Sequence, residues 1–257
     1  MTLTEQYVAF TTIVVKEFMR FIRIWVQTVL PAMITMSLYF VIFGNLIGSQ
    51  LAPIHGYSYV DYIVPGIILM AIINNSYANV VSSFFSAKFQ RHIEEMLVSP
   101  MPNYLILLGF VGGGLSRGLI VGVGVTIVAA FFTDLQFYNP LIVIFVTLLT
   151  SILFALGGFI NAMYAKSFDD ISIIPTFVLT PLTYLGGIFY SVEMLPDFWQ
   201  SVSYVNPILY MINAMRYGML GVSDIDVNLA LAIIVGFVVV LYGFCLYLLR
   251  RGIGIRS

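Results

Sequence analysis

Long apolar stretches separated by short polar segments run through the whole chain. A helix rises about 1.5 Å per residue, so about 20 apolar residues cross a hydrocarbon core of about 30 Å. Of the 257 residues, 60% are apolar and 9% are charged, which excludes a water-soluble globular protein. We predict an all-α, polytopic membrane protein with one domain over residues 1–257 and a core of six transmembrane helices within residues 26–249. The predicted spans are 26–47, 60–83, 112–132, 140–164, 171–190 and 228–249.

The basic residues gather on one side of the predicted spans. If the chain crosses six times, ten of the eleven Lys and Arg residues flank the same face, and Arg216 alone lies in an outer segment. Basic side chains favour the cytoplasmic ends of membrane helices, so both termini are predicted to be cytoplasmic, with residues 250–257 as a tail. Arg117 counts among the ten because its apolar run is long enough for the side chain to reach the cytoplasmic surface. The other nine are Lys16, Arg20, Arg23, Lys88, Arg91, Lys166, Arg250, Arg251 and Arg256.

The segment before the first span, residues 1–25, has a helical pattern of its own. Phe18, Ile22 and Trp25 occupy one face, which predicts an amphipathic helix lying in the plane of the lipid bilayer. This helix could be a membrane anchor or a docking surface for a partner. No small-residue cleavage site follows the first apolar run, so we expect the whole chain to stay in a bacterial inner (plasma) membrane. The polar stripe of the helix contains Thr12, Lys16, Arg20, Arg23 and Gln27.

The loop between the second and third spans predicts a short amphipathic helix over residues 88–99. Phe89, Ile93, Met96 and Leu97 share one helical face, and charged side chains share the other. Prolines at positions 100 and 102 end the helix, because proline lacks an amide donor and disfavours helix in the preceding residue. Such a helix either contacts a cytoplasmic partner or is a solvated surface. The candidate contact residues are Lys88, Arg91, His92, Glu94 and Glu95.

Polar side chains follow one face of the second span and one face of the fifth. Polar groups in lipid are costly unless they meet partners or water. They could therefore hydrogen-bond between packed helices or line a path for a substrate. Pro175 and Pro181 predict a bend in the fifth span. The candidate path residues are Asn75, Asn79, Ser82, Thr176, Thr180 and Thr183.

Two further segments carry structural signals. Six glycines between Gly112 and Gly124 predict close helix packing of the third span. In the outer segment, residues 191–225, Pro196 can begin one short helix, and a second that contains Arg216 can follow Asn206. We take Arg216 and Asp197 as the candidate ion pair of this segment. The remaining acids within reach of Arg216 are Glu193, Asp224 and Asp226.

The chain carries no sign of nucleotide, metal or nucleic-acid binding of its own. A phosphate-binding loop places a lysine after glycine, whereas the three lysines here follow Val15, Ala87 and Ala165. His55 and His92 lack partners at metal-ligand spacing, and no basic cluster suggests nucleic acid. No Asp or Glu lies in the middle of a span, which argues against an ion-coupled secondary transporter. No acid or histidine cluster favours a membrane-embedded enzyme acting on lipid-linked substrates. The ion-coupled transporter and the membrane-embedded enzyme nevertheless stay open as alternatives.

Four short runs of the chain form a characteristic set: EEMLVSP at residues 94–100, LPDFW at 195–199, NPILY at 206–210 and RYG at 216–218. These runs, the first of them a coupling-type segment, resemble the type 2 ABC transporter permeases. Residues 168–187 are also similar to a Gram-negative inner-membrane permease of this family. The resemblance covers nearly the whole chain and includes the order of its six spans.

This resemblance implies a permease that works as a homodimer with two copies of a separate ABC ATPase, which binds ATP and Mg. The helix at residues 88–99 would then couple to the ATPase, and the second and fifth spans would line the route. The outer helices would be re-entrant in the outer leaflet. Export of an amphiphilic cargo, lipid-like, glycan-like or drug-like, follows from the family resemblance alone.

Overall fold

The computed structural model describes residues 1–254, and the part of the chain that it describes folds into helices without strands. The predicted tail residue Arg256 lies outside the described residues. Five helices in the described part are long and apolar enough to cross a membrane. Their bounds are Trp25–Gly44, Tyr59–Phe89, Asn103–Ala129, Pro140–Tyr164 and Val227–Arg251.

The fifth predicted span differs from these five. Residues Asp170–Leu185 form a shorter apolar helix, so a sixth crossing stays a prediction. This helix consists of α8 (Asp170–Ile174), a π-helical turn (Pro175–Leu179) and α9 (Thr180–Leu185). The irregularity lies where Pro175 and Pro181 predict a bend. Thr180 Oγ1 donates to the carbonyl of Pro175 at 2.9 Å, which helps to satisfy the wider turn.

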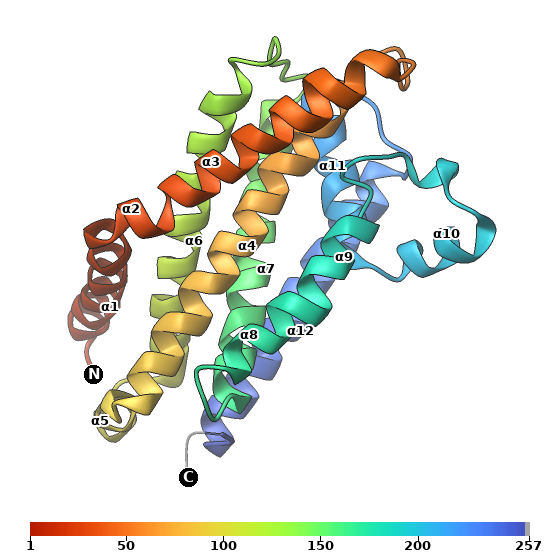
Figure 1. Ribbon diagram of the computed structural model, residues 1–257. Coiled ribbons are helices and arrows are strands. Elements are labelled where there is room, and N and C mark those ends of the chain that lie inside the picture. Colours follow the sequence, from red (N-terminus) through yellow and green to blue (C-terminus); the bar gives the residue numbers. More distant parts are fainter. Residues whose placement is uncertain (255–257) are drawn as a thin grey trace.

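The first apolar helix is also irregular. It combines α2 (Trp25–Thr28), α3 (Leu30–Tyr39) and a π-helical segment (Phe40–Ile47), and the turn Gly48–Gln50 follows. Before it, α1 (Leu3–Arg23) begins with a capping box between Thr2 and Glu5. Figure 1 shows α1 at the same end of the bundle as the C-terminal end of α12, beside the lower part of α6.

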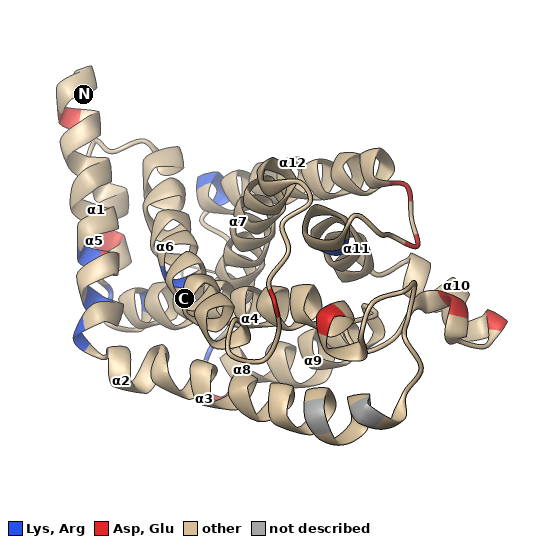
Figure 2. Ribbon diagram, turned by 90° about the horizontal axis from the view of Figure 1, so that it is seen from above, with Lys and Arg blue, Asp and Glu red and all other residues tan. Residues whose placement is uncertain are grey.

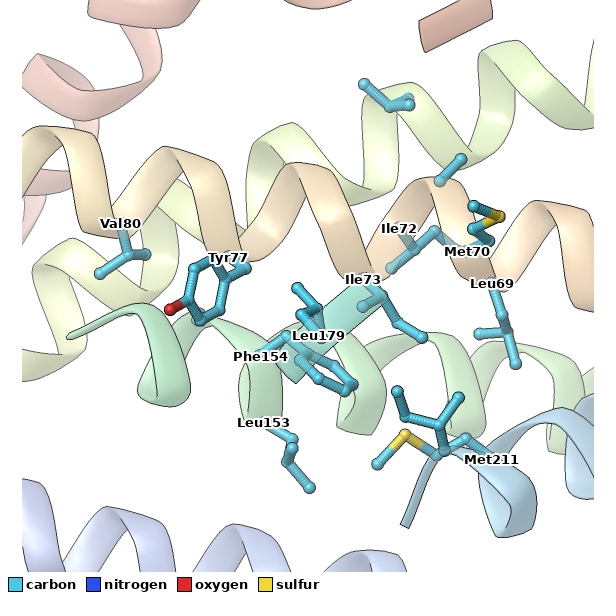
Figure 3. Close-up of a cluster of buried hydrophobic side chains, with 14 of the residues drawn as sticks. Leu69, Met70, Ile72, Ile73, Tyr77, Val80, Leu153, Phe154, Leu179 and Met211 are labelled. Atoms are coloured by element: carbon cyan, nitrogen blue, oxygen red, sulfur yellow. The ribbon is translucent and has the colours of Figure 1, made fainter. Parts of the chain in front are cut away.

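Helix α4 (Tyr59–Phe89) is the centre of the bundle and is buried over most of its length. It packs against α6 (Asn103–Ala129), α7 (Pro140–Tyr164) and α11 (Pro207–Leu220), and α12 (Val227–Arg251) covers α7 and α11 (Figure 1). Apolar side chains of α4, α7 and α11 meet Leu179 in the core (Figure 3). The charged residues lie largely toward the ends and the edge of this assembly (Figure 2).

Close packing at the glycines of α6 confirms the prediction for the third span. A Cβ atom on Gly114 would lie 2.6 Å from Val80 and 3.0 Å from Ala155. A Cβ atom on Gly122 would lie 2.8 Å from Ile72. The absence of side chains at these positions therefore lets α6 approach α4 and α7 closely.

The outer segment begins with the turn Val192–Met194 and continues with α10 (Asp197–Tyr204) and α11. Pro196 precedes α10, and Pro207 is the first residue of α11, as predicted. Asn206 caps α11 by accepting a hydrogen bond from the amide of Ile208 at 3.0 Å. Helix α11 packs into the bundle, whereas α10 projects from it (Figure 1). Insertion of either helix into the outer leaflet remains a prediction.

Candidate coupling surface and transport route

The predicted helix over residues 88–99 is wrong as a single element. Helix α4 continues to Phe89, and Arg91 then adopts a left-handed conformation with φ of 62° before α5 (His92–Val98) begins. Lys88 and Phe89 therefore belong to α4. The left-handed residue turns the chain sharply, which separates the short helix from the long one.

Helix α5 presents its charged residues outward. Ile93 is 1% exposed and anchors α5 in the core next to the end of α4. The side chains of Arg91, His92, Glu94 and Glu95 are all exposed. Four of the five candidate contact residues are therefore placed on one accessible surface, which we call the α5 surface.

Lys88 has a different position from the other four. Its Nζ atom donates to the carbonyl oxygens of Met163 and Ala165, both at 2.7 Å. These carbonyls belong to the end of α7, which has no further helical donors for them. Lys88 thus joins the C-terminal ends of α4 and α7. A cleft of about 650 Å³ lies beside it, and Arg91, Glu94 and Lys166 also line this cleft.

A capping box precedes the fifth apolar segment. Ser167 Oγ accepts a hydrogen bond from the amide of Asp170, and the Asp170 carboxylate accepts one from the amide of Ser167. The same carboxylate accepts from the amide of Lys166 at 2.8 Å. These bonds hold the α7–α8 loop at the edge of the cleft.

Two of the candidate path residues lie inside the helix bundle. Asn75 is 7% exposed, and its Oδ1 atom accepts from Arg117 Nε at 3.2 Å and Nη2 at 3.0 Å. Asn79 is fully buried, and its Oδ1 atom accepts from Arg20 Nη2 at 2.8 Å. These asparagines join α4 to α6 and α1, as the helix-packing alternative requires.

The accessible face of α4 lies one residue away from the predicted stripe. Between residues 62 and 87, only Asn74, Ala78, Ser82 and Ser86 escape burial, at a spacing of four residues. Ser82 is therefore the one candidate on α4 that reaches this face. The spacing was visible in the sequence, but the identity of the open face depends on where α1 and α6 pack.

The candidate path residues on the fifth apolar segment also include both exposed and buried side chains. Thr176 and Thr180 are exposed. Thr183 is 1% exposed and donates to the carbonyl of Leu179 at 2.6 Å. Phe177, between the two exposed threonines, is 74% exposed, so the outward face of α8 and α9 is largely apolar.

A buried polar cluster joins α1 to α4, and the sequence interpretation missed its acid. Glu17 is 1% exposed and accepts hydrogen bonds from Ser83 Oγ and from Arg20 Nε, the latter at 3.3 Å. Arg20 thus points partly into the bundle, although it belongs to the predicted polar stripe of this helix. The available signal was the position of Glu17 between Ile13 and Phe21 at helical spacing, since both of these are buried.

The candidate ion pair of the outer segment is also corrected. Arg216 is 1% exposed and lies 3.8 Å from Asp224, whereas Asp197 only begins α10. The guanidinium stacks 3.9 Å from the ring of Tyr62, and Nη2 donates to the carbonyl of Gly187 at 2.7 Å. Arg216 therefore ties α11 to α4 and to the two loops around it.

Known proteins match the chain over most of the helices described above. Residues 8–220 match the model of the ABC-2 type transporter family. The chain is 54% identical over 251 residues, 98% of each chain, to the Inner membrane transport permease YadH of Escherichia coli strain K12. It is 26% identical over 209 residues, 81% of each chain, to Nodulation protein J of Rhizobium leguminosarum bv. viciae. With its long apolar helices, this protein is a multi-pass membrane protein that belongs to the ABC-2 type transporter family.

Proposed function

We propose that the chain is the permease subunit of an ATP-driven exporter, in which the α5 surface transmits movement from a separate ATPase. The observation that carries the proposal is the attachment of this surface to the core. Ile93 is buried, and Lys88, at the end of α4, donates to two carbonyls of α7. A push on α5 would therefore move the ends of two central helices together.

The subunit arrangement is part of the same proposal. Two copies of the chain pair with two ABC ATPase subunits, which bind ATP and Mg and hydrolyse the nucleotide. The family match over residues 8–220 supports an ATPase partner. Because the similar protein of Escherichia coli is named an inner membrane permease, we assign this chain to the bacterial inner membrane.

The orientation follows from where the charges lie. Helix α1, helix α5 and the C-terminal end of α12 lie at one end of the bundle (Figure 1). This end contains Arg91, Lys166, Arg250 and Arg251, and basic residues favour the cytoplasmic side. Both termini and the α5 surface are therefore assigned to the cytoplasm, where the ATPase would bind.

The route is assigned to the space between two copies of the chain. Its polar wall would be the open face of α4, which contains Asn74 and Ser82, together with Thr176 and Thr180 on the fifth apolar segment. The apolar remainder of that segment, such as Phe177, suits an amphiphilic cargo with lipid-like, glycan-like or drug-like character. The irregular turn Pro175–Leu179 supplies a place where this wall could bend as the route opens.

The test uses reversal of one exposed charge on α5. Glu95→Lys should leave the protein level in the membrane near normal, because Glu95 is exposed and Ile93 still anchors the helix. The affinity-tagged chain, purified from native membranes in mild detergent, should recover a nucleotide-hydrolysing partner when wild type. Recovery of that partner and of its ATPase activity should fall several-fold in Glu95→Lys.

The matched control is Asp134→Lys, a reversal of the same kind on an exposed acid at the other end of α6. It should leave partner recovery unchanged. Equal recovery in wild type and Glu95→Lys would show that α5 is only a solvated surface. Nucleotide hydrolysis by this chain alone, free of other proteins, would contradict the proposal as a whole.

A further inference from the structure

Arg117 occupies an unusual position for a charged residue. It lies near the middle of α6, which is long and apolar enough to span a membrane, and it is half-buried. Counting back from Ala129 at about 1.5 Å per residue, Arg117 lies about 18 Å from the outer end of α6. It therefore lies about 12 Å inside the cytoplasmic boundary of a hydrocarbon core of about 30 Å. This corrects the prediction that its side chain reaches the cytoplasmic surface, because α6 ends at Ala129 and the guanidinium turns toward Asn75. At this depth an unpaired charge is costly, and intramembrane charges commonly mark functional sites.

The charge of Arg117 is not balanced by the acids around it. Its hydrogen bonds run from Nε and Nη2 to a single neutral acceptor, Asn75 Oδ1. The nearby carboxylate of Glu17 is engaged by Arg20 and Ser83. Over residues 1–254, Arg117 forms no ion pair. Arg20 binds Asn79, one helical turn along α4 from Asn75, so the cluster has two cations and one anion.

Unused hydrogen-bond donors accompany this excess charge. A guanidinium has five donors, and Arg117 uses only those of Nε and Nη2. Asn79 is fully buried, and its Nδ2 atom lacks a partner within the described residues. This Nδ2 lies beside Gly113, one helical turn from Arg117, where a Cβ atom would be only 3.3 Å away. A buried donor without an acceptor is costly, so its presence suits a site that an acceptor can occupy.

We propose that Arg117, with Arg20 and Asn79, binds the anionic head of an amphiphile taken from the cytoplasmic leaflet. The group recognised is an oxyanion, above all a phosphate ester, because a guanidinium binds such groups with charge-assisted, often bidentate bonds. The surroundings suit an acyl chain rather than a free ion, since Arg117 lies within a helix that is long and apolar enough to span a membrane. The inference rests on the proposed function and names the class of its cargo.

The test measures lipid binding by the full chain without its ATPase. The purified chain in detergent is mixed with phosphatidylglycerol and phosphatidylcholine of equal acyl length, and native mass spectrometry counts the lipids retained. Wild type should retain phosphatidylglycerol in preference. Arg117→Gln should weaken that binding about tenfold, the effect expected for loss of one charge-assisted bond. Arg117→Lys should keep most of the preference, because it keeps the charge.

Three controls make the result decisive. Arg23→Gln removes an exposed positive charge from the same region of α1 and should change nothing. Glutamine at position 117 keeps an amide donor for Asn75, and equal thermal unfolding of the variant would show that the bundle is intact. Inorganic phosphate in millimolar excess separates the sources of the ligand. If it displaces phosphatidylglycerol, the oxyanion alone is recognised, and if it does not, the acyl chain contributes to binding.

Equal retention of both lipids by wild type, or an unchanged preference in Arg117→Gln, would overturn the inference. A change in the number of chains per particle in Arg117→Gln, with unchanged lipid retention, would show instead that a second copy balances this charge. None of these outcomes depends on ATPase recovery, so failure here is distinguishable from failure of the proposed coupling role of α5.

Discussion

The contact at Gly118 is a sharp test of how the central helices pack. Ser76 of α4 and Ser151 of α7 are fully buried, and their Oγ atoms form a hydrogen bond of 2.7 Å. Gly118 of α6 covers this pair. A Cβ atom at position 118 would lie 2.7 Å from Ser151 Oγ and would also collide with Ser76 Oγ. Gly118→Ala must therefore push α6 away or break the serine pair.

The expected cost follows from these two effects. Overpacking a tight site costs about 1–3 kcal/mol, and loss of one interhelical hydrogen bond in a membrane protein costs about 0.6 kcal/mol. Alanine stabilises a helix by about 0.5–1 kcal/mol relative to glycine. This difference contributes little to the free energy of unfolding if the unfolded state in the membrane stays helical. We expect Gly118→Ala to lower the free energy of unfolding by about 1–3 kcal/mol.

Gly236 provides the matched control. It lies in the middle of α12, and a Cβ atom there would meet nothing within 4 Å. Gly236→Ala should leave stability unchanged or slightly higher. The free energy of unfolding is measured for both variants by titration with dodecyl sulfate in mixed micelles, followed by circular dichroism. Equal stability of Gly118→Ala and Gly236→Ala would refute the close approach of α6 to the serine pair.

Three other expectations follow from individual side chains. A cysteine at Ser82, on the open face of α4, should change its reactivity toward a polar thiol reagent when the ATPase is trapped with nucleotide. A control cysteine at lipid-facing Ile144 should stay unlabelled in every state. Equal protection of the cysteine at position 82 in every state would exclude a route along this face. Lys88→Met should lower the free energy of unfolding by about 1–3 kcal/mol, because it leaves carbonyls at the end of α7 without a donor. Arg216→Met should cost about 3–5 kcal/mol, since it removes the buried cation beside Asp224 and the donor to the carbonyl of Gly187, whereas Asp197→Asn should cost almost nothing. A large effect of Asp197→Asn in the same dodecyl sulfate titration would instead favour the pair expected from the sequence.

The sequence by itself determined the features that depend on local physics. Apolar stretches of sufficient length predicted the five long apolar helices, because the cost of exposing backbone polar groups in lipid requires helices there, whereas the sixth predicted span corresponds to the shorter helix Asp170–Leu185. Proline and asparagine signals placed the starts of α10 and α11 correctly, since proline at the first helical position and asparagine at the cap act within a few residues. The glycines of α6 predicted close packing, because small residues let helix backbones approach each other.

Only the tertiary structure decided which polar residues face one another. Hydropathy assigns a residue to a span but does not say which side of that span meets another helix. Asn75 and Asn79 therefore looked equivalent to Ser82, although α1 and α6 cover the two asparagines and leave the serine open. Arg91 interrupts the coupling segment through its backbone conformation, which no periodic pattern of side chains encodes.

The charged clusters depend in the same way on contacts between distant segments. Arg216 pairs with Asp224 and not with Asp197, which begins α10, because α11 packs into the bundle while α10 projects from it. Glu17 became a buried partner for Arg20 and Ser83 only when α1 packed against α4 and α6. Charge and hydropathy thus determine where the chain meets the membrane, and long-range packing determines which polar groups are paired and which are left available for a ligand.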